Sequence, residues 1–142
     1  MTIYNGSFQV SATRRLEVVD LTSKVSDVVR ESGLENGIVI VYLPHATAAV
    51  AINEHDGDLW EDMMASLSRL VPIHGDYRHN AKYAGWSKEQ NAHAHIINCM
   101  LKPDVTIPLR GGEMTLGTWQ SILLIELDGP RTRKIIVQVM GE

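Results

Sequence analysis

Histidine is the residue type whose number and spacing in this sequence point most clearly to chemistry. The chain of 142 residues has six histidines, and four of them lie between positions 74 and 95. A neutral imidazole is a common metal ligand, and histidine also exchanges protons near neutral pH. A single histidine is more often a surface residue, but this density indicates a metal-binding or acid–base site.

Helical geometry reduces the number of histidines that can share one site. A capping-box pattern at residues 87–90 predicts a helix that begins there and runs to about Leu101. On such a helix His93 and His95 are two positions apart and point to different sides. One of the two must therefore lie outside any common centre.

The metal-binding hypothesis that remains uses His45, His79 and His95. His79 lies in a polar loop, where binding residues concentrate, and His45 begins a strand of small residues. Three imidazoles suit a divalent metal such as zinc. Spacing alone does not bring the three together, so this triad is a hypothesis.

Two carboxylates lie beside apolar segments. Glu54 follows residues 48–53 at the end of a predicted strand, and Glu126 lies inside the run Ile122–Leu127. A buried carboxylate without a partner is costly. Glu126 should therefore pair with a cation or metal, face a polar cavity, or lie where the strand opens to solvent. On an unbulged strand Gln120 points to the same side as Glu126, which predicts a polar stripe on the sheet.

The neighbouring segments add an aromatic ring and positive charge. Trp119, beside Gln120, is expected in the core. Arg131, Arg133 and Lys134 follow a Gly-Pro turn. Guanidinium groups bind phosphate in a bidentate manner, so this cluster is either a phosphate contact or a solvated turn.

The overall charge limits the kinds of partner. The formal net charge of -4 argues against nucleic acid as the main partner, because phosphate backbones bind to basic surfaces. A local basic pocket for a small phosphorylated substrate remains compatible with it. The sequence has no glycine-rich phosphate loop and no GxSxG motif.

The predicted elements alternate between strands and helices in an order typical of an α+β fold. Strands are expected at residues 3–10, 15–20, 38–43, 45–54, 105–109, 114–127 and 135–140. Helices are expected from a cap at Thr22 or Ser23 to Gly33, from a cap at Asp56 or Asp58 to Pro72, and over residues 87–101. The run Ile38–Leu43 has the pattern of a strand buried on both faces. This order predicts largely antiparallel sheets with two to three helices.

Composition and length predict a single domain over residues 1–142. Hydrophobic residues make up 44% of the chain and charged residues 21%, as in ordinary globular domains. The lone cysteine, Cys99, excludes an internal disulfide and is expected to be buried. No signal-peptide pattern or apolar run of about 20 residues is present, so we expect a cytoplasmic protein without a membrane partner.

Several short motifs, in their order and spacing, resemble one known family over essentially the whole chain. The motifs are His45-Ala46-Thr47-Ala48-Ala49 continuing to Asn53-Glu54, Tyr77-Arg78-His79, Ala94-His95-Ile96, Ile107-Pro108, Leu116-Gly117-Thr118-Trp119-Gln120, Glu126, and Asp128-Gly129-Pro130-Arg131-Thr132-Arg133. They resemble the YjbQ family, also described as secondary thiamine-phosphate synthases. Asn80 departs from the pattern, because the residue after this histidine is often acidic in the family.

The resemblance implies an α+β fold that assembles as a homotrimer, with a polar site near the subunit boundaries. It also implies that a hydroxymethylpyrimidine diphosphate is joined to a thiazole phosphate, with release of pyrophosphate, as a weak or secondary activity of the family. Carried over by position, it implies catalytic roles for His45, Glu54 and Glu126, substrate binding by Thr47, Asn53, Thr118, Gln120 and Arg131, and metal binding by His45, His79 and His95. The implied cofactor is a divalent metal, either zinc or magnesium with the diphosphate.

Three functional hypotheses follow from these residues. The first is the transferase that the resemblance implies. The second is a metal-dependent hydrolase of a small phosphorylated compound, which would use the same residues to activate water. The third is a trimeric protein that binds a metal or ligand without turnover.

Overall fold

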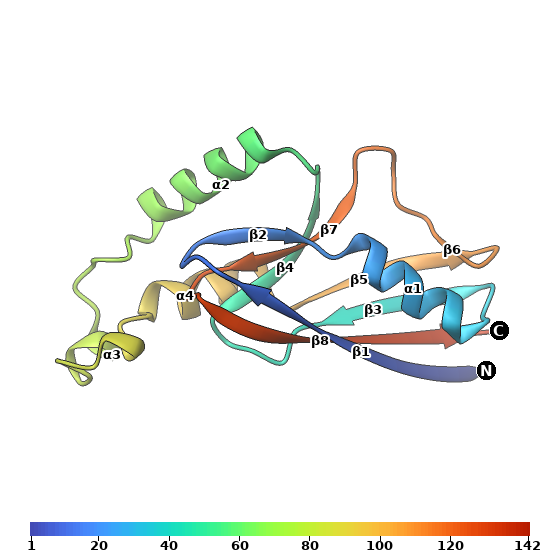
Figure 1. Cartoon of the computed structure of the whole chain (residues 1–142), viewed down its shortest axis with the longest axis horizontal. Helices are drawn as coiled ribbons and strands as arrows, with labels where there is room; N and C mark the ends of the chain where they lie inside the picture. Colours follow the sequence, from blue (N-terminus) through green and yellow to red (C-terminus); the bar gives the residue numbers. More distant parts are fainter.

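Alternation of apolar and polar side chains builds the larger of two antiparallel sheets. The computed structural model describes residues 1–142, and Figure 1 shows the arrangement of its elements. The larger sheet has five strands in the order β1 (Thr2–Ala12), β8 (Arg131–Gly141), β3 (Gly37–Tyr42), β5 (Asp104–Arg110) and β6 (Glu113–Met114). On β8 the inward residues Ile135, Val137 and Val139 are fully buried, whereas Ile136, Gln138 and Met140 point outward.

The smaller sheet contains the strand that is buried on both faces. Its order is β2 (Glu17–Asp20), β7 (Ser121–Glu126) and β4 (Ala48–Asn53), again antiparallel. Every residue of β7 from Ile122 to Glu126 is 0% exposed. The continuous apolar sequence of β7 therefore reflects burial between two layers.

The small sheet forms the middle layer of the molecule. One face packs against the large sheet, with Val50 and Leu124 in the same core cluster as Val39 and Val137. The other face packs against α4 and α2, and Leu123 lies there in a second cluster with Ala94. In Figure 1 α2 lies outside the sheets, and both termini lie at the opposite end from α3 and α4.

The structure has four α-helices, one more than the upper limit expected from the sequence. They are α1 (Thr22–Ser32), α2 (Gly57–Leu70), α3 (Arg78–Ala81) and α4 (Ala92–Leu101). The additional helix is the single turn of α3, which is too short to produce a periodic pattern. None of the helices is both long and apolar enough to cross a membrane.

The expected helix ends are partly right. Asp56 caps α2 by accepting a hydrogen bond from the amide of Leu59 at 3.0 Å, and Gly33 ends α1 with a φ of 67°. Thr22 is not a cap, because its hydroxyl accepts a hydrogen bond from the amide of Ile122. The capping-box prediction at Ser87 is wrong. Residues 87–89 form a 3-10 turn, and the regular helix α4 begins only at Ala92.

The strand expected over residues 114–127 is two strands separated by a loop. Residues 115–120 connect β6 to β7, so Gln120 does not lie on β7 and the predicted polar stripe does not form. Instead, the side chain of Gln120 turns back and accepts a hydrogen bond from the amide of Gly117 at 2.8 Å. Trp119 is 73% exposed, contrary to its expected core position. Cys99 is also exposed, contrary to expectation.

The outward face of the large sheet carries an apolar row. Cross-strand pairing aligns Ile3 with Met140, Met140 with Ile38, and Ile38 with Pro108. Ile3 is 50% exposed and Ile38 is 39% exposed. Residues 38–43 are predicted from the sequence to be buried on both faces. In a single copy of the chain this is wrong, because only the face bearing Val39 and Val41 is covered.

Candidate functional site

A fully buried ion pair joins the two sheets. Glu126, the last residue of β7, is 0% exposed, and Arg133 on β8 is 3% exposed. The guanidinium of Arg133 donates from Nε to Oε1 at 2.7 Å and from Nη2 to Oε2 at 2.6 Å. This bidentate contact supplies the cation that a carboxylate in such an apolar run requires. Glu126 is therefore paired, and it does not lie at a strand end open to solvent.

The same pair fixes two neighbouring segments. Arg133 Nη2 also donates to the carbonyl oxygen of Thr47 at 3.0 Å and to its Oγ1 at 2.9 Å. The amides of Leu127 and Asp128 each donate to Glu126 Oε2 at 3.0 Å. Both carboxylate oxygens of Glu126 are thus occupied. In this chain Glu126 is fully buried, and its contacts position Arg133 and the β7–β8 turn.

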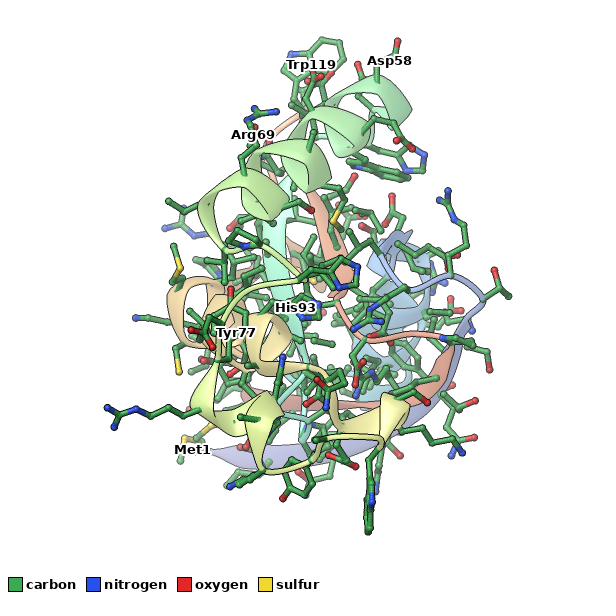
Figure 2. The ribbon with its side chains drawn as sticks, turned by 90° about the vertical axis from the view of Figure 1, so that its left-hand side faces the viewer. Met1, Asp58, Arg69, Tyr77, His93 and Trp119 are labelled. Atoms are coloured by element: carbon green, nitrogen blue, oxygen red, sulfur yellow. The ribbon has the colours of Figure 1, made fainter.

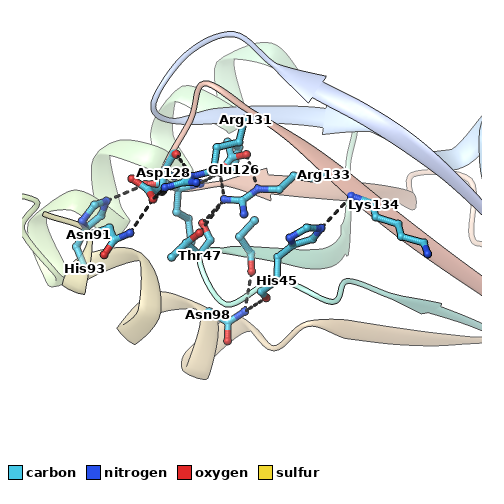
Figure 3. Close-up of polar contacts among 12 residues, drawn as sticks. His45, Thr47, Asn91, His93, Asn98, Glu126, Asp128, Arg131, Arg133 and Lys134 are labelled. Atoms are coloured by element: carbon cyan, nitrogen blue, oxygen red, sulfur yellow. Dashed lines mark hydrogen bonds and ion pairs between the residues drawn. The ribbon is translucent and has the colours of Figure 1, made fainter. Parts of the chain in front are cut away.

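Asp128 extends this network toward the surface (Figure 3). Its Oδ2 accepts hydrogen bonds from Asn91 Nδ2 at 2.8 Å and from Arg131 Nη2 at 2.8 Å. Arg131 Nε donates to the carbonyl oxygen of Asp128 at 2.9 Å. Asn91 precedes α4, so Asp128 connects the β7–β8 turn to that helix. The Arg131 side chain is 40% exposed and presents its remaining guanidinium hydrogens outward.

His45 lies beside the buried pair as a neutral imidazole. Its Nε2 accepts a hydrogen bond from the backbone amide of Lys134 at 2.9 Å. Burial, with help from the nearby positive charge of Arg133, lowers the pKa of His45 below its usual range. A neutral ring that accepts at Nε2 carries its proton on Nδ1. His45 can therefore donate one hydrogen bond from Nδ1 at neutral pH.

The side chains of His79 and His95 lie next to each other and form a histidine pair. Their ring centroids are 5.0 Å apart and the rings are tilted by 55°. Asn80 Oδ1 accepts from the amide of Ala92, which identifies it as an acceptor, so His79 Nδ1 donates to it at 3.0 Å. The acidic residue expected in the family at this position is thus replaced by an amide that orients the ring. Burial lowers the pKa of His95, and the adjacent His79 lowers it further.

The three expected metal ligands do not meet within one chain. His45 has no free ring lone pair, because Nε2 is an acceptor and Nδ1 holds the proton. His79 Nε2 is free, and His95 lies beside it, but no three His, Cys, Asp or Glu side chains lie close enough to hold a metal ion. The residues of one chain therefore do not fit the three-histidine zinc site, and only two of its members come together.

His93 is buried inside the molecule and does not join the His79–His95 pair, which agrees with the prediction that one histidine of this helix lies outside a common centre. It is 1% exposed and lies within the molecule in Figure 2, where its Nε2 donates to the carbonyl oxygen of Leu127 at 2.8 Å. Its Nδ1 is buried without a partner. Burial lowers the pKa of His93, and the charge of Arg15 lowers it further. His93 and His95 do face different partners, as predicted.

The remaining candidates lie at the other end of the small sheet. Ala48 pairs with Glu126 and Asn53 pairs with Ser121, so β4 and β7 run between two separate ends. Five residue steps of a strand cover about 17 Å. His45, Thr47, His79, His95 and Arg131 lie at the Glu126 end. Asn53, Glu54, Thr118 and Gln120 lie at the Ser121 end.

Sequence reasoning missed several residues that build the site. From the sequence, Arg133 falls in a basic cluster expected to be either a phosphate contact or a solvated turn, although it shares the inward parity of Ile135 and Val137 on β8. That parity was a usable signal for a buried cation. Asn91 and Asp128 gave no comparable signal, because a hydrogen bond between segments 37 residues apart leaves no periodic pattern.

Removing one charge of the buried pair should destabilise the fold strongly. We expect Glu126→Gln to lower the free energy of unfolding by about 3–5 kcal/mol, because it leaves Arg133 buried without its counter-charge. Urea denaturation followed by circular dichroism measures the change. Glu61→Gln, at an exposed position on α2, should change stability by less than about 0.5 kcal/mol. An E126L/R133M double variant as unstable as Glu126→Gln would contradict the charge-pair explanation.

His93 should make stability depend on pH. The pKa of His93 is lowered in the folded chain. Below about pH 6.5 His93 is therefore protonated in the unfolded chain while it stays neutral in the folded chain. Its contribution is complete above that pH and is lost as the pH falls through the lowered pKa. Arg15 and His74 oppose protonation there, and Asp128 favours it. Thermal unfolding from pH 7 to pH 5 should show a smaller loss of Tm for His93→Gln than for the unmodified protein. Equal slopes would refute this assignment.

Comparison with known proteins agrees with this architecture. The family description "UPF0047 protein YjbQ-like" matches residues 6–142. A UPF0047 protein of Methanothermobacter thermautotrophicus is 41% identical over 142 residues, covering 100% of this chain and 95% of the relative. The UPF0047 protein YugU of Bacillus subtilis is 33% identical, covering 95% of this chain and 98% of the relative.

Solved structures show the same fold. A YbjQ-like protein of unknown function from Sulfolobus solfataricus has a TM-score of 0.93 and 37% identity, covering 99% of both chains. A hypothetical protein from Aeropyrum pernix has a TM-score of 0.91 and 42% identity, covering 97% of this chain and 98% of the other. The network around Glu126 and Arg133 is thus set in a fold shared over nearly the whole length, and the chain belongs to the YjbQ/UPF0047 family.

Proposed function

We propose that this protein is a thiamine-phosphate-synthase-like transferase, which joins a hydroxymethylpyrimidine diphosphate to a thiazole phosphate and releases pyrophosphate. The observation that carries the proposal is the Glu126 end of the small sheet. There Asp128 holds Arg131 in place, and the neutral ring of His45 is bonded to the amide of Lys134, three residues further along β8. Oriented donors and a fixed cation suit a reaction in which negative charge develops on a leaving diphosphate.

In the proposed reaction the bond between the pyrimidine methylene carbon and the diphosphate oxygen breaks. The thiazole ring nitrogen bonds to that carbon, and both electrons of the broken bond leave with pyrophosphate. The ring nitrogen carries no proton, so the transfer depends on charge stabilisation. Arg131 would hold the diphosphate with two guanidinium contacts, and His45 would donate from Nδ1. Thr47 Oγ1 accepts from Arg133 and keeps its own hydroxyl hydrogen for a substrate oxygen.

The proposed site uses two copies of the chain. Asn53, Glu54, Thr118 and Gln120 lie about 17 Å from the Glu126 end, which is too far for one small substrate to contact both ends directly. Contact between the Ser121 end of one copy and the Glu126 end of the next would complete the site. Glu54 would then place its carboxylate beside the pyrimidine methylene carbon, where positive charge develops, and the other three would bind substrate.

A homotrimer is the proposed assembly. The exposed apolar row of Ile3, Met140, Ile38 and Pro108 supports burial of this sheet face against another copy. Contacts that run from one end of a chain to the other end of the next are heterologous, and such contacts form a ring when the rotation between copies closes. Three copies form the smallest such ring.

The proposed metal is magnesium bound to the diphosphate of the substrate. A magnesium ion usually keeps several waters and is held by substrate phosphates with few protein ligands, so it does not need a three-histidine site. The phosphorylated substrates are charged and stay in the compartment where they are made. We therefore place the protein in the cytoplasm, with no nucleic acid or membrane partner.

A metal-dependent hydrolase is the second candidate. The observation that favours it is the His79–His95 pair, which leaves at least one ring nitrogen free. A zinc ion on that pair would need a further ligand from a second copy or from the substrate. Hydrolysis of the diphosphate in the absence of thiazole phosphate would identify this activity.

Turnover with both substrates tests the transferase. We expect thiamine phosphate and pyrophosphate in equal amounts, measured by chromatography and a coupled pyrophosphate assay with Mg²⁺ present. His45→Gln and Arg131→Gln should each lower kcat about 100-fold by removing a donor to the leaving group. Arg110→Gln, at an exposed position on β5, should keep the wild-type rate. Binding of the substrates by the unmodified protein, without release of pyrophosphate, would instead favour a ligand-binding protein.

Mixing variants tests whether the site is shared between copies. His45→Gln alters one end and Glu54→Gln the other, so each should be inactive alone. Refolding the two together should restore about one quarter of the wild-type rate, because one junction in four then has both ends intact. Light scattering should give three times the 15.8 kDa chain mass. No recovery in mixed trimers would mean that each chain holds its own site.

A further inference from the structure

Arg15 is a half-buried arginine without an acidic partner. It lies in the turn between β1 and β2, and its Nη2 donates to the carbonyl oxygen of Gln90 at 2.8 Å. Its Nε is buried and has no hydrogen-bond partner. An unsatisfied, charged donor is costly when it is buried. A half-buried arginine without a carboxylate partner is expected where an anion supplies the missing counter-charge.

Two adjoining cavities meet at Arg15. One has a volume of about 390 Å³ and is lined entirely by polar residues, glycine and proline, including Ser87, Lys88 and Arg131. The other has a volume of about 440 Å³ and includes His74 and Gln90. Ser87 lines both cavities together with Arg15. A group placed between them would contact side chains from three separate segments.

The charge of the polar cavity is positive, although the chain as a whole is acidic. Arg15, Lys88 and Arg131 supply three positive charges, against the one carboxylate of Asp128. That carboxylate is already bonded to Arg131 and Asn91. A local excess of positive charge on a chain of net charge -4 indicates an anion site.

The backbone holds this site in shape. The amide of Gly129 donates to the carbonyl oxygen of Arg15 at 3.0 Å, which ties the β1–β2 turn to the β7–β8 turn. A Cβ at Gly129 would lie 2.0 Å from the carbonyl oxygen of Arg14, so only glycine permits this approach. Arg15 and Arg131 are therefore fixed relative to each other before any ligand binds.

We propose that this cavity binds the phosphate or diphosphate group of a small phosphorylated molecule. Arg15 and Arg131 contact its oxygens with guanidinium hydrogens, Lys88 adds a positive charge, and the Ser87 hydroxyl donates one further hydrogen bond. The inference deepens the proposed function, and the identity of the phosphorylated molecule as a transferase substrate rests on it. The binding of the anion does not depend on turnover.

The test is calorimetric titration of the whole protein with inorganic pyrophosphate and with inorganic phosphate, at constant ionic strength. We expect Arg15→Gln to weaken pyrophosphate binding at least tenfold, because it removes a charge-assisted contact. Lys88→Gln alters an exposed side chain, so it keeps the fold and should weaken binding several-fold. Arg110→Gln has the same charge change at the opposite end of the large sheet and should bind as wild type.

The outcomes separate this site from the transferase. Wild-type affinity in both Arg15→Gln and Lys88→Gln, or no binding by the unmodified protein, would overturn the proposed cavity. Pyrophosphate binding that depends on Arg15 in a protein without transferase turnover would support the cavity and refute the proposed reaction. Turnover that survives Arg15→Gln with unchanged KM would refute the cavity alone.

Discussion

The buried pair of Glu126 and Arg133 is the interaction on which the candidate site depends. It is the only ion pair in the chain whose two side chains are both almost completely buried, and it joins β7 of the small sheet to β8 of the large sheet. Burying two charges is costly unless their hydrogen-bonding groups are satisfied. Here Thr47 and the amides of Leu127 and Asp128 accept or donate the remaining bonds. The register between the sheets is therefore specified by polar contacts as well as by packing.

The Glu126–Arg133 pair also positions the residues of the β7–β8 turn. Because Glu126 holds the amide of Asp128, the Asp128 carboxylate is aimed at Asn91 and Arg131, which fixes both the start of α4 and a cation at the surface. The charge of Arg133 also helps to keep His45 neutral by lowering its pKa. The charge state of His45 and the orientation of Asp128 thus depend on a fully buried ion pair.

The sequence predicted what depends on local pattern and short-range chemistry. Alternation on β8, the apolar run of β7 and the Asp56 cap are local signals, and the α+β class with antiparallel sheets followed from them. Predictions from local pattern were wrong where tertiary contacts determine the start of a helix or the role of a side chain. Ser87 matches a capping box, yet Asn80 satisfies the amide of Ala92, and the helix begins there. His45 seemed equivalent to His79 and His95 as a ligand, but a backbone amide of β8 occupies its ring nitrogen. That contact joins residues 89 positions apart and has no signature in the sequence.

The length of β4 decides how the remaining candidates can cooperate. A strand is a nearly rigid spacer, and the pairing of Asn53 with Ser121 and of Ala48 with Glu126 holds both ends apart. No side-chain rotation brings Glu54 or Gln120 to His45, because an extended glutamate or glutamine side chain spans only a fraction of about 17 Å. If the residues at both ends act on one substrate, then the second end must belong to another copy. The exposed apolar row on the large sheet gives such a copy a surface to bury, so the same argument relates the chemistry of the site to the assembly of the protein.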